Sequence, residues 1–174
     1  MTKVLLVCLA IFLFLANCQK KEEPKVQTPF PAGPVQTQNE IGLLQDAVRK
    51  DPKNLSAWIN LGNIMMDTSR FDEAIDAYQH ALELDPENVD VRVDMGTCYR
   101  SIGRPDKAVE EFRKAVKINP RHLYAHRNLG VVLAFDIGDK KSAIKEFEEY
   151  LRLSPDTPDT QRIRQEIAKL KASK

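Results

Sequence analysis

The chain has 174 residues, of which 43% are hydrophobic, 29% are charged and only seven are glycine. This composition is typical of one soluble, helix-rich domain and argues against a disordered or membrane-spanning chain. Basic residues number 26 and acidic residues 25. The chain therefore lacks the positive surplus that phosphate binding requires, and we expect no nucleic-acid partner.

The N-terminus has the layout of a signal peptide. Lys3 is the only charged residue before position 18, and an apolar run follows it at residues 4–16. A helix needs about 20 apolar residues to cross a bilayer, so this run is too short to span one comfortably. A short apolar run behind a positive charge is instead characteristic of a secretory signal.

The apolar run ends in four residues that resemble the lipobox of bacterial lipoproteins: Leu15, Ala16, Asn17 and Cys18. The resemblance implies that residues 1–17 are a lipoprotein signal peptide and that Cys18 begins the mature protein, modified with a lipid such as palmitate. Asn17 departs from the small residue that is usual before the cysteine, so an uncleaved anchor or a plain secretory signal is the alternative. Gln19 is not aspartate, which by the usual sorting rule implies the periplasmic face of the outer membrane, with the inner membrane as the alternative.

Residues 18–37 are predicted to form the lipidated cysteine and a proline-rich linker. The segment contains four prolines: Pro24, Pro29, Pro31 and Pro34. It has few large apolar residues and no helical periodicity. Proline-rich segments stay extended at about 3.1 Å per residue, so roughly 20 residues could hold a domain about 60 Å from the lipid surface.

From residue 38 onward the sequence is a repeat. Four kinds of residue recur at intervals of 34 or 35: Pro52, Pro86, Pro120 and Pro155; Gly62, Gly96 and Gly130; Ala74, Ala108 and Ala143; and Tyr78, Phe112 and Phe147. Several residue types that keep one period are a strong indication of a repeat architecture. The unit resembles the tetratricopeptide repeat (TPR), whose signature positions in the first unit are occupied by Trp58, Leu61, Gly62, Ala74, Tyr78, Ala81 and Pro86.

The resemblance implies an all-α fold, a right-handed α-solenoid of TPR helical hairpins with a single capping helix at each end. The expected parts of the TPR domain, residues 38–174, are a lone helix at 38–50, repeats at about 55–88, 89–122 and 123–157, and a capping helix at about 158–172. The last helix carries Ile163, Ile167 and Leu170 on one face. This face should close the apolar end of the stack, as solenoids require.

The signature residues have separate physical tasks. Glycine and alanine stand where two helices approach closely, and a larger side chain there would overpack the contact by about 1–3 kcal/mol. Proline ends the second helix of each unit because it lacks an amide donor. Asn54, Asn88 and Thr157 stand where the next helix begins, so their side chains should cap its free amides.

The third unit departs from the other two. It has one extra residue between Leu133 and Ala143, which we expect in the turn at residues 137–140. It also has Tyr150 where alanine is usual. This larger side chain should loosen the hairpin or alter its tilt.

In the TPR family, the first helices of the units line an inner groove. The residues of this chain at the corresponding positions are Ser56, Ile59, Asn63, Met66, Asp90, Val93, Thr97, Arg100, Tyr124, Arg127, Val131 and Phe135. Their mixed, partly apolar character suits an extended peptide or a helix with a few apolar anchors, held by Arg100 and Arg127 through a carboxylate or a carbonyl. For any single residue, a plain solvated face is the alternative.

Chaperone-binding members of the family hold a C-terminal carboxylate with a clamp of lysines and asparagines. Only Asn63 fits this set, and the other four places that we compared hold Ile59, Asp94, Tyr124 and Asn128. We therefore predict no binding of that type.

Candidates for catalysis are few. His122 and His126 are four residues apart, as metal ligands on one helix face can be, but no cysteine or carboxylate joins them at a suitable spacing. His126 also falls at the packing position that tryptophan holds in the first unit, so structural histidines are favoured. Acidic pairs such as Glu110–Glu111 recur with the repeat and are interpreted as solvated faces, and Cys98 as a small packed residue. With no phosphate-binding loop or nucleophile motif, we expect no enzyme, no cofactor and no metal site.

The sequence thus predicts a membrane-anchored TPR lipoprotein that acts as a protein–protein interaction scaffold or adaptor in the bacterial cell envelope. Its partner should be a protein or a peptide in the groove, with the membrane held through the lipid on Cys18. The alternative is a carrier or regulatory subunit that presents a ligand or substrate to an envelope enzyme, with Tyr124, His126 and Arg127 as the contact cluster.

Overall fold

The computed structural model describes residues 34–156 and 158–173. The chain divides into two units, Met1–Ala32 and Gly33–Lys174, and every described helix belongs to the second unit. The predicted signal peptide, Cys18, most of the linker and Thr157 lie outside the described residues. Within the described part, no helix combines the length and the apolar character that a bilayer crossing requires.

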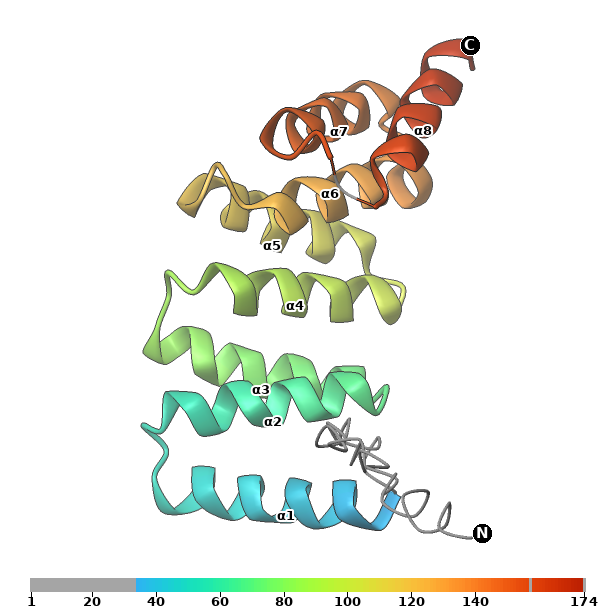
Figure 1. The fold of residues 1–174 in the computed structure, drawn as a ribbon. Helices are drawn as coiled ribbons and strands as arrows, with labels where there is room; N and C mark the ends of the chain where they lie inside the picture. Colours follow the sequence, from blue (N-terminus) through green and yellow to red (C-terminus); the bar gives the residue numbers. More distant parts are fainter. Residues whose placement is uncertain (1–33, 157, 174) are drawn as a thin grey trace, which may run out of the picture. The chain divides into compact units, whose positions relative to one another are not determined.

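The described residues form three helical hairpins between two single helices. The helices are α1 (Pro34–Lys50), α2 (Leu55–Asp67), α3 (Phe71–Leu84), α4 (Val89–Ser101), α5 (Pro105–Ile118), α6 (Leu123–Val132), the short π-helical segment η1 (Leu133–Ile137), α7 (Lys140–Leu153) and α8 (Thr160–Ala172). Each helix packs on the one before it, so the helices follow one another along a stack (Figure 1). The predicted all-α solenoid with a capping helix at each end is confirmed.

The first helices of the three hairpins begin in the same way. The side chain of Asn54 accepts a hydrogen bond from the amide of Ala57, and that of Asn88 accepts one from Val91. Nδ1 of His122 accepts the equivalent bond from the amide of Ala125, at 3.1 Å. The prediction of asparagine caps is confirmed, and His122 is a third cap at the same spacing, because any short side-chain acceptor can satisfy the free amides of a helix start.

The repeated glycines lie directly against the repeated aromatic rings. A Cβ atom added at Gly62, Gly96 or Gly130 would lie 2.4, 2.7 or 2.6 Å from the ring of Tyr78, Phe112 or Phe147, respectively. These distances are far below ordinary contact, and the three rings are buried. Glycine therefore sets how closely the two helices of each hairpin approach, as the sequence predicted.

At one position of the repeat, three different side chains make the same hydrogen bond. At this position a side-chain nitrogen bonds to the carbonyl oxygen of the turn proline: Trp58 Nε1 to Pro52 at 3.0 Å, Arg92 Nη2 to Pro86 at 2.7 Å, and His126 Nε2 to Pro120 at 3.0 Å. The bond satisfies a carbonyl group that would otherwise be left open at the helix end. What the three side chains share is an N–H donor at the right reach.

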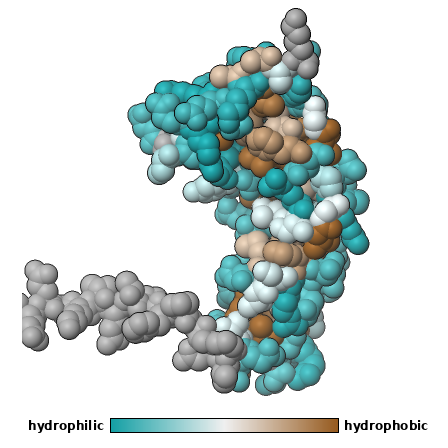
Figure 2. All heavy atoms as spheres, turned by 90° about the vertical axis from the view of Figure 1, so that its right-hand side faces the viewer, coloured by the Kyte–Doolittle hydropathy of each residue, from teal (hydrophilic) through white to brown (hydrophobic). Residues whose placement is uncertain are grey.

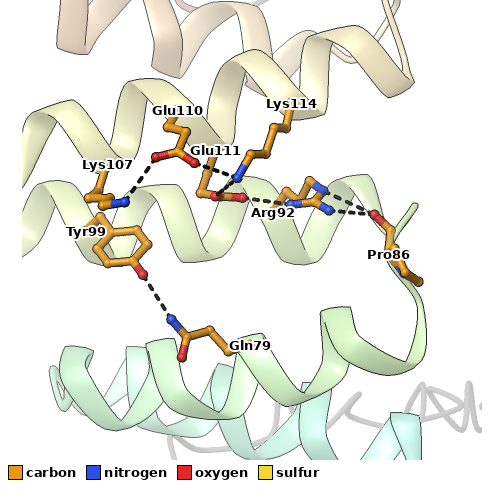
Figure 3. A network of polar contacts seen from close by, with 8 residues as sticks. All are labelled: Gln79, Pro86, Arg92, Tyr99, Lys107, Glu110, Glu111 and Lys114. Atoms are coloured by element: carbon orange, nitrogen blue, oxygen red, sulfur yellow. Dashed lines mark hydrogen bonds and ion pairs between the residues drawn. The ribbon is translucent and has the colours of Figure 1, made fainter.

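The second hairpin extends this contact into a buried ion pair. Arg92 bridges Pro86 and Glu111, and its Nη1 lies 2.8 Å from Oε2 of Glu111 (Figure 3). Lys114 Nζ lies 2.7 Å from the other oxygen of the same carboxylate. The interpretation of Glu110–Glu111 as a solvated face is thus wrong for Glu111, which is only 6% exposed, because the arginine beneath it neutralises its charge.

The extra residue of the third unit lies in the helix and not in the turn at residues 137–140, where we expected it. The first helix of this unit continues through η1, whereas its turn is shorter than the turns of the first two units. A π-helical segment accommodates one added residue without breaking the helix. The segment ends at Gly138, whose φ of 82° belongs to the left-handed region that favours glycine.

Tyr150 connects the third hairpin to the capping helix. It is only 3% exposed, and its hydroxyl group donates a hydrogen bond to Oδ1 of Asp159, just before α8. α8 also buries Ile163 and Ile167 against the core, as predicted. Its axis is steeply inclined to the axes of the stacked helices (Figure 1). At the other end, α1 begins at Pro34, within the segment predicted as linker, because proline is favoured in the first turn of a helix.

Candidate peptide-binding groove

A pocket lies between α4, α6 and α8. Its volume is about 570 Å³, and five of the predicted groove residues line it: Thr97, Arg100, Arg127, Val131 and Phe135. Its other lining residues are Phe112, Asn128, Phe147 and, from α8, Arg162, Ile163 and Glu166. The pocket is therefore a joint product of the second and third repeats and the capping helix.

A second pocket of about 620 Å³ adjoins the first and shares Arg127 and Arg162 with it. Tyr124, Tyr150 and Asp159 are among its other lining residues. We call the two pockets together the groove. On the face that Figure 2 presents, apolar residues form separate patches between hydrophilic ones, so recognition on such a surface needs polar contacts as well as apolar ones.

Ion pairs across the stack hold the arginines of the groove. Nε of Arg127 lies 2.6 Å from Oδ2 of Asp159, and Nε of Arg100 lies 2.5 Å from Oδ2 of Asp136. Arg162 also approaches Oδ2 of Asp159, at 3.5 Å. The pairs of Arg127 and Arg100 join residues more than 30 positions apart in sequence, and they fix these two guanidinium groups in the walls of the groove.

The π-helical segment supplies one residue that lines the groove and the carboxylate that pairs with another. Phe135 is 57% exposed and lines the first pocket, and its neighbour Asp136 pairs with Arg100 of α4. Helices with one extra residue in a π turn occur frequently at functional sites. The insertion that interrupts the repeat thus contributes directly to the groove.

Five predicted groove residues lie elsewhere, on α2 and at the start of α4: Ser56, Ile59, Asn63, Met66 and Asp90. The hydroxyl group of Tyr78 donates to Oδ1 of Asn63 at 2.8 Å, so this asparagine serves the hairpin contact. Asp90 accepts a hydrogen bond from Nε2 of His122 at 2.9 Å. Val93 is only 5% exposed, and it therefore supports the surface from beneath and does not line it.

Asp94 makes this part of α4 acidic. Burial, together with the nearby carboxylates of Asp90 and Asp67, raises the pKa of Asp94 to about 6. Among the described residues, no hydrogen bond or ion pair reaches its carboxyl group. An incoming carboxylate would meet a negative charge here at neutral pH, at one of the places where the chaperone clamp has asparagine.

His122, which caps α6, and His126 within it both have structural roles. His126 is 4% exposed, with Nε2 on the carbonyl of Pro120 and Nδ1 lying 2.7 Å from Oε2 of Glu146. The hydrogen bond to Glu146 raises the pKa of His126 above its ordinary value, against the opposing effect of burial. The prediction that Tyr124, His126 and Arg127 form a contact cluster is therefore wrong for His126, because this residue is buried and both of its ring nitrogens already have partners.

The thiol of Cys98, a possible nucleophile, is also part of the core. Cys98 is fully buried, and burial raises the pKa of its thiol to about 12. It packs as a small apolar residue, as expected. Within the described residues, no group of histidine, cysteine, aspartate or glutamate side chains has the arrangement of a metal site.

Stacked helical hairpins with a repeated glycine–aromatic contact define a TPR protein. The model of one family, described as the cytochrome c-type biogenesis protein H TPR domain, matches residues 36–162. The chain belongs to this family.

Solved structures with a similar fold are also TPR proteins. The crystal structure of MamA is 21% identical with a TM-score of 0.73, over 78% of this chain and 77% of MamA. The first TPR of Spaghetti (RPAP3), bound to the HSP90 peptide SRMEEVD, is 24% identical with a TM-score of 0.65, over 71% of this chain and 97% of that one. The Arabidopsis OM64 TPR domain is 17% identical with a TM-score of 0.62, over 66% and 94% of the two chains. No curated protein matches the sequence.

Proposed function

We propose that this protein is a membrane-anchored scaffold or adaptor of the bacterial cell envelope that binds a partner protein in its groove. The observation that carries the proposal is the groove itself, in which α4, α6 and α8 place exposed aromatic residues beside arginines. TPR domains are interaction modules, and concave surfaces with a few convergent polar groups are where peptides and ligands bind.

The anchoring part of the proposal rests on the sequence at residues 1–18. The lipobox-like end at Cys18 supports a lipid anchor, and the proline-rich segment behind it supports a tether. A palmitoyl chain together with further acyl chains would hold the protein durably, since two lipid signals suffice for stable anchoring. The family name makes assembly of c-type cytochromes the first pathway to examine.

The partner should differ from the one in the structure of the first TPR of Spaghetti (RPAP3), which holds a peptide ending in EEVD. Asp94 and Ile59 stand where a clamp would need donors to a terminal carboxylate. We therefore propose that a peptide with an acidic C-terminus binds weakly or not at all. Nanomolar affinity of this domain for such a peptide would contradict the proposal.

A second candidate function is a carrier or regulatory subunit that presents a small ligand to an envelope enzyme. The volume of the first pocket, about 570 Å³, favours it, because small-molecule sites occupy about 300–1,000 Å³. Saturable binding of a small molecule to the purified domain supports this candidate. The absence of such binding at about millimolar ligand would count against it.

In-cell crosslinking followed by mass spectrometry tests the adaptor proposal. The wild type is compared with Cys18→Ser, with the double variant Tyr124→Ala, Arg127→Ala, and with the control Arg113→Ala, Ile118→Ala. The control removes one arginine and one large apolar side chain from the exposed surface of α5, away from the groove.

We expect one partner that is lost in the groove variant, retained in the control and reduced when Cys18 is changed. Partners that remain in the groove variant would place binding elsewhere on the protein. If no partner appears in any sample, the carrier function becomes the better explanation.

A further inference from the structure

The groove has an apolar anchor on each side of its arginines. Tyr124 is 63% exposed and Phe135 is 57% exposed, and Arg127 lies between them on the same stripe of α6 and η1. The step from 124 to 135 is eleven positions. At a rise of about 1.5 Å per residue, the two aromatic side chains start about 16 Å apart. An extended chain advances about 3.3 Å per residue, so five residues place their first and last Cα atoms about 13 Å apart, and the reach of the two end side chains covers the remainder.

The charges between the anchors leave a positive surplus. Arg127 and Arg162 share the single carboxylate of Asp159, which also accepts a hydrogen bond from Tyr150. Arg100 forms an ion pair with Asp136 that it shares with no other described arginine. Glu166 also lines the groove, but its carboxylate forms an ion pair with Nζ of Lys169, at a distance of 2.7 Å. Three guanidinium groups therefore face two carboxylates, those of Asp136 and Asp159.

The arginines also have hydrogen-bond donors to spare. A guanidinium group carries five N–H donors. Arg127 uses Nε toward Asp159 and one Nη1 donor toward Asn128, and Arg100 uses Nε toward Asp136, with no further partners for either among the described residues. Side chains of the protein already fix these donors in direction. Carboxylates make the strongest contacts with donors of this kind, because the hydrogen bonds are charge-assisted and can be paired.

We propose that the groove binds an internal, extended segment of a partner protein, in which one Asp or Glu lies two residues from a large apolar residue on either side. The inference rests on the proposed function and specifies the chemistry of the partner. Side chains at alternate positions of an extended chain point to one face, so the acidic group meets the arginines while the apolar groups meet Tyr124 and Phe135. An internal segment is required because the groove continues beyond the arginines in both directions, and a chain end at the arginines would leave one anchor empty.

Fluorescence anisotropy with defined peptides tests the pattern. The protein is the full chain with Cys18→Ser, and the probe is a fluorescein-labelled peptide, blocked at both ends, with the core Leu-Ser-Glu-Ser-Phe between glycine and serine residues. We expect saturable binding that weakens about tenfold when glutamine replaces glutamate and that weakens as the salt concentration rises. Moving the glutamate by one position should also weaken binding, because its side chain then points away from the arginines.

A pair of matched variants tests the arginines. Arg162→Gln should weaken binding of the glutamate peptide about tenfold and leave the glutamine peptide unaffected. The side chain of Arg162 is 62% exposed and Arg127 stays on Asp159, so the fold should be retained, as circular dichroism can verify. Arg113→Gln is the control, since this exposed arginine of α5 lies outside the groove and joins no ion pair within the described residues.

Three results would overturn the inference: no saturable binding at about 1 mM peptide, equal affinity for the glutamate and glutamine peptides, or no effect of Arg162→Gln. Equal affinity for a peptide that ends at the glutamate would refute the internal segment. If crosslinking finds a partner that needs Tyr124 and Arg127 while the peptides fail, the adaptor function stands and only the predicted partner chemistry is wrong.

Discussion

The close contact between Gly96 and Phe112 gives a quantitative prediction for Gly96→Ala. The new Cβ atom would lie 2.7 Å from Cε1 of the ring, whereas ordinary contact begins at about 3.4 Å, so ring and helix must separate by about 0.7 Å. Phe112 is 1% exposed and is packed among the residues of the core. Overpacking of this kind costs about 1–3 kcal/mol, and alanine recovers about 1 kcal/mol through its higher helix propensity. We expect a net loss of up to about 2 kcal/mol in the free energy of unfolding.

Gly42 of α1 is the matched control, because a Cβ atom added there meets nothing within 4 Å. Gly42→Ala should therefore stabilise the protein by about 0.5–1 kcal/mol. Urea denaturation followed by helical circular dichroism measures both variants, and the midpoints should move in opposite directions. Phe112→Leu in the Gly96→Ala background should recover part of the loss, as a double-mutant cycle would show. If Gly96→Ala is as stable as Gly42→Ala, the glycine–aromatic contact does not set the helix spacing.

Three further predictions concern single side chains. The pKa of His126 is raised in the folded state, so protonated His126 stabilises the protein. This stabilisation is complete below the unfolded pKa of about 6.5 and is lost as the pH rises through the folded pKa. The denaturation midpoint of the wild type should fall over this pH range, and that of His126→Arg should not. The raised pKa of Asp94, about 6, also makes stability fall as the pH rises, because the folded state disfavours the charged carboxylate. This destabilisation is absent below about pH 4, grows between about pH 4 and 6 and is complete above about pH 6, so Asp94→Asn should add ~2 kcal/mol at pH 7 and nothing at pH 4. Trp58→Ala should lower the free energy of unfolding by about 2–4 kcal/mol, because the half-buried indole stacks on His80 at a centroid distance of 4.4 Å and donates a hydrogen bond to a turn carbonyl. Tyr124→Ala, at an exposed position, should change it by no more than about 0.5 kcal/mol in the same denaturation assay.

The repeat and the hairpin contacts could be predicted from the sequence because they depend on neighbours at a fixed spacing. A glycine and an aromatic residue that both recur every 34 or 35 positions must meet in each hairpin if they meet in one. Helix starts at Asn54 and Asn88 are equally local, since a cap bonds an amide three residues ahead. These features needed no knowledge of how the hairpins stack.

Residue type and position in the repeat do not determine the environment of every side chain. Glu111 was interpreted as solvated like its neighbour Glu110, but it is buried on Arg92, one hairpin helix away. The extra residue of the third unit was placed in a turn, because loops usually absorb insertions, yet the helix takes it up in η1. Burial and helix register both depend on packing partners that the local sequence does not identify.

The sequence by itself determined the TPR class, the number of hairpins and the stripe along α6 and η1 that carries Tyr124, Arg127, Val131 and Phe135. Only the tertiary structure decided that this stripe becomes one wall of a groove, because the opposite wall is α8, a helix outside the repeat. The placement of α8 depends on contacts of Asp159 with Arg127, 32 positions away, and with Tyr150. A periodic pattern fixes what each unit contacts in the next, whereas a single cap is positioned by individual side chains that no period predicts.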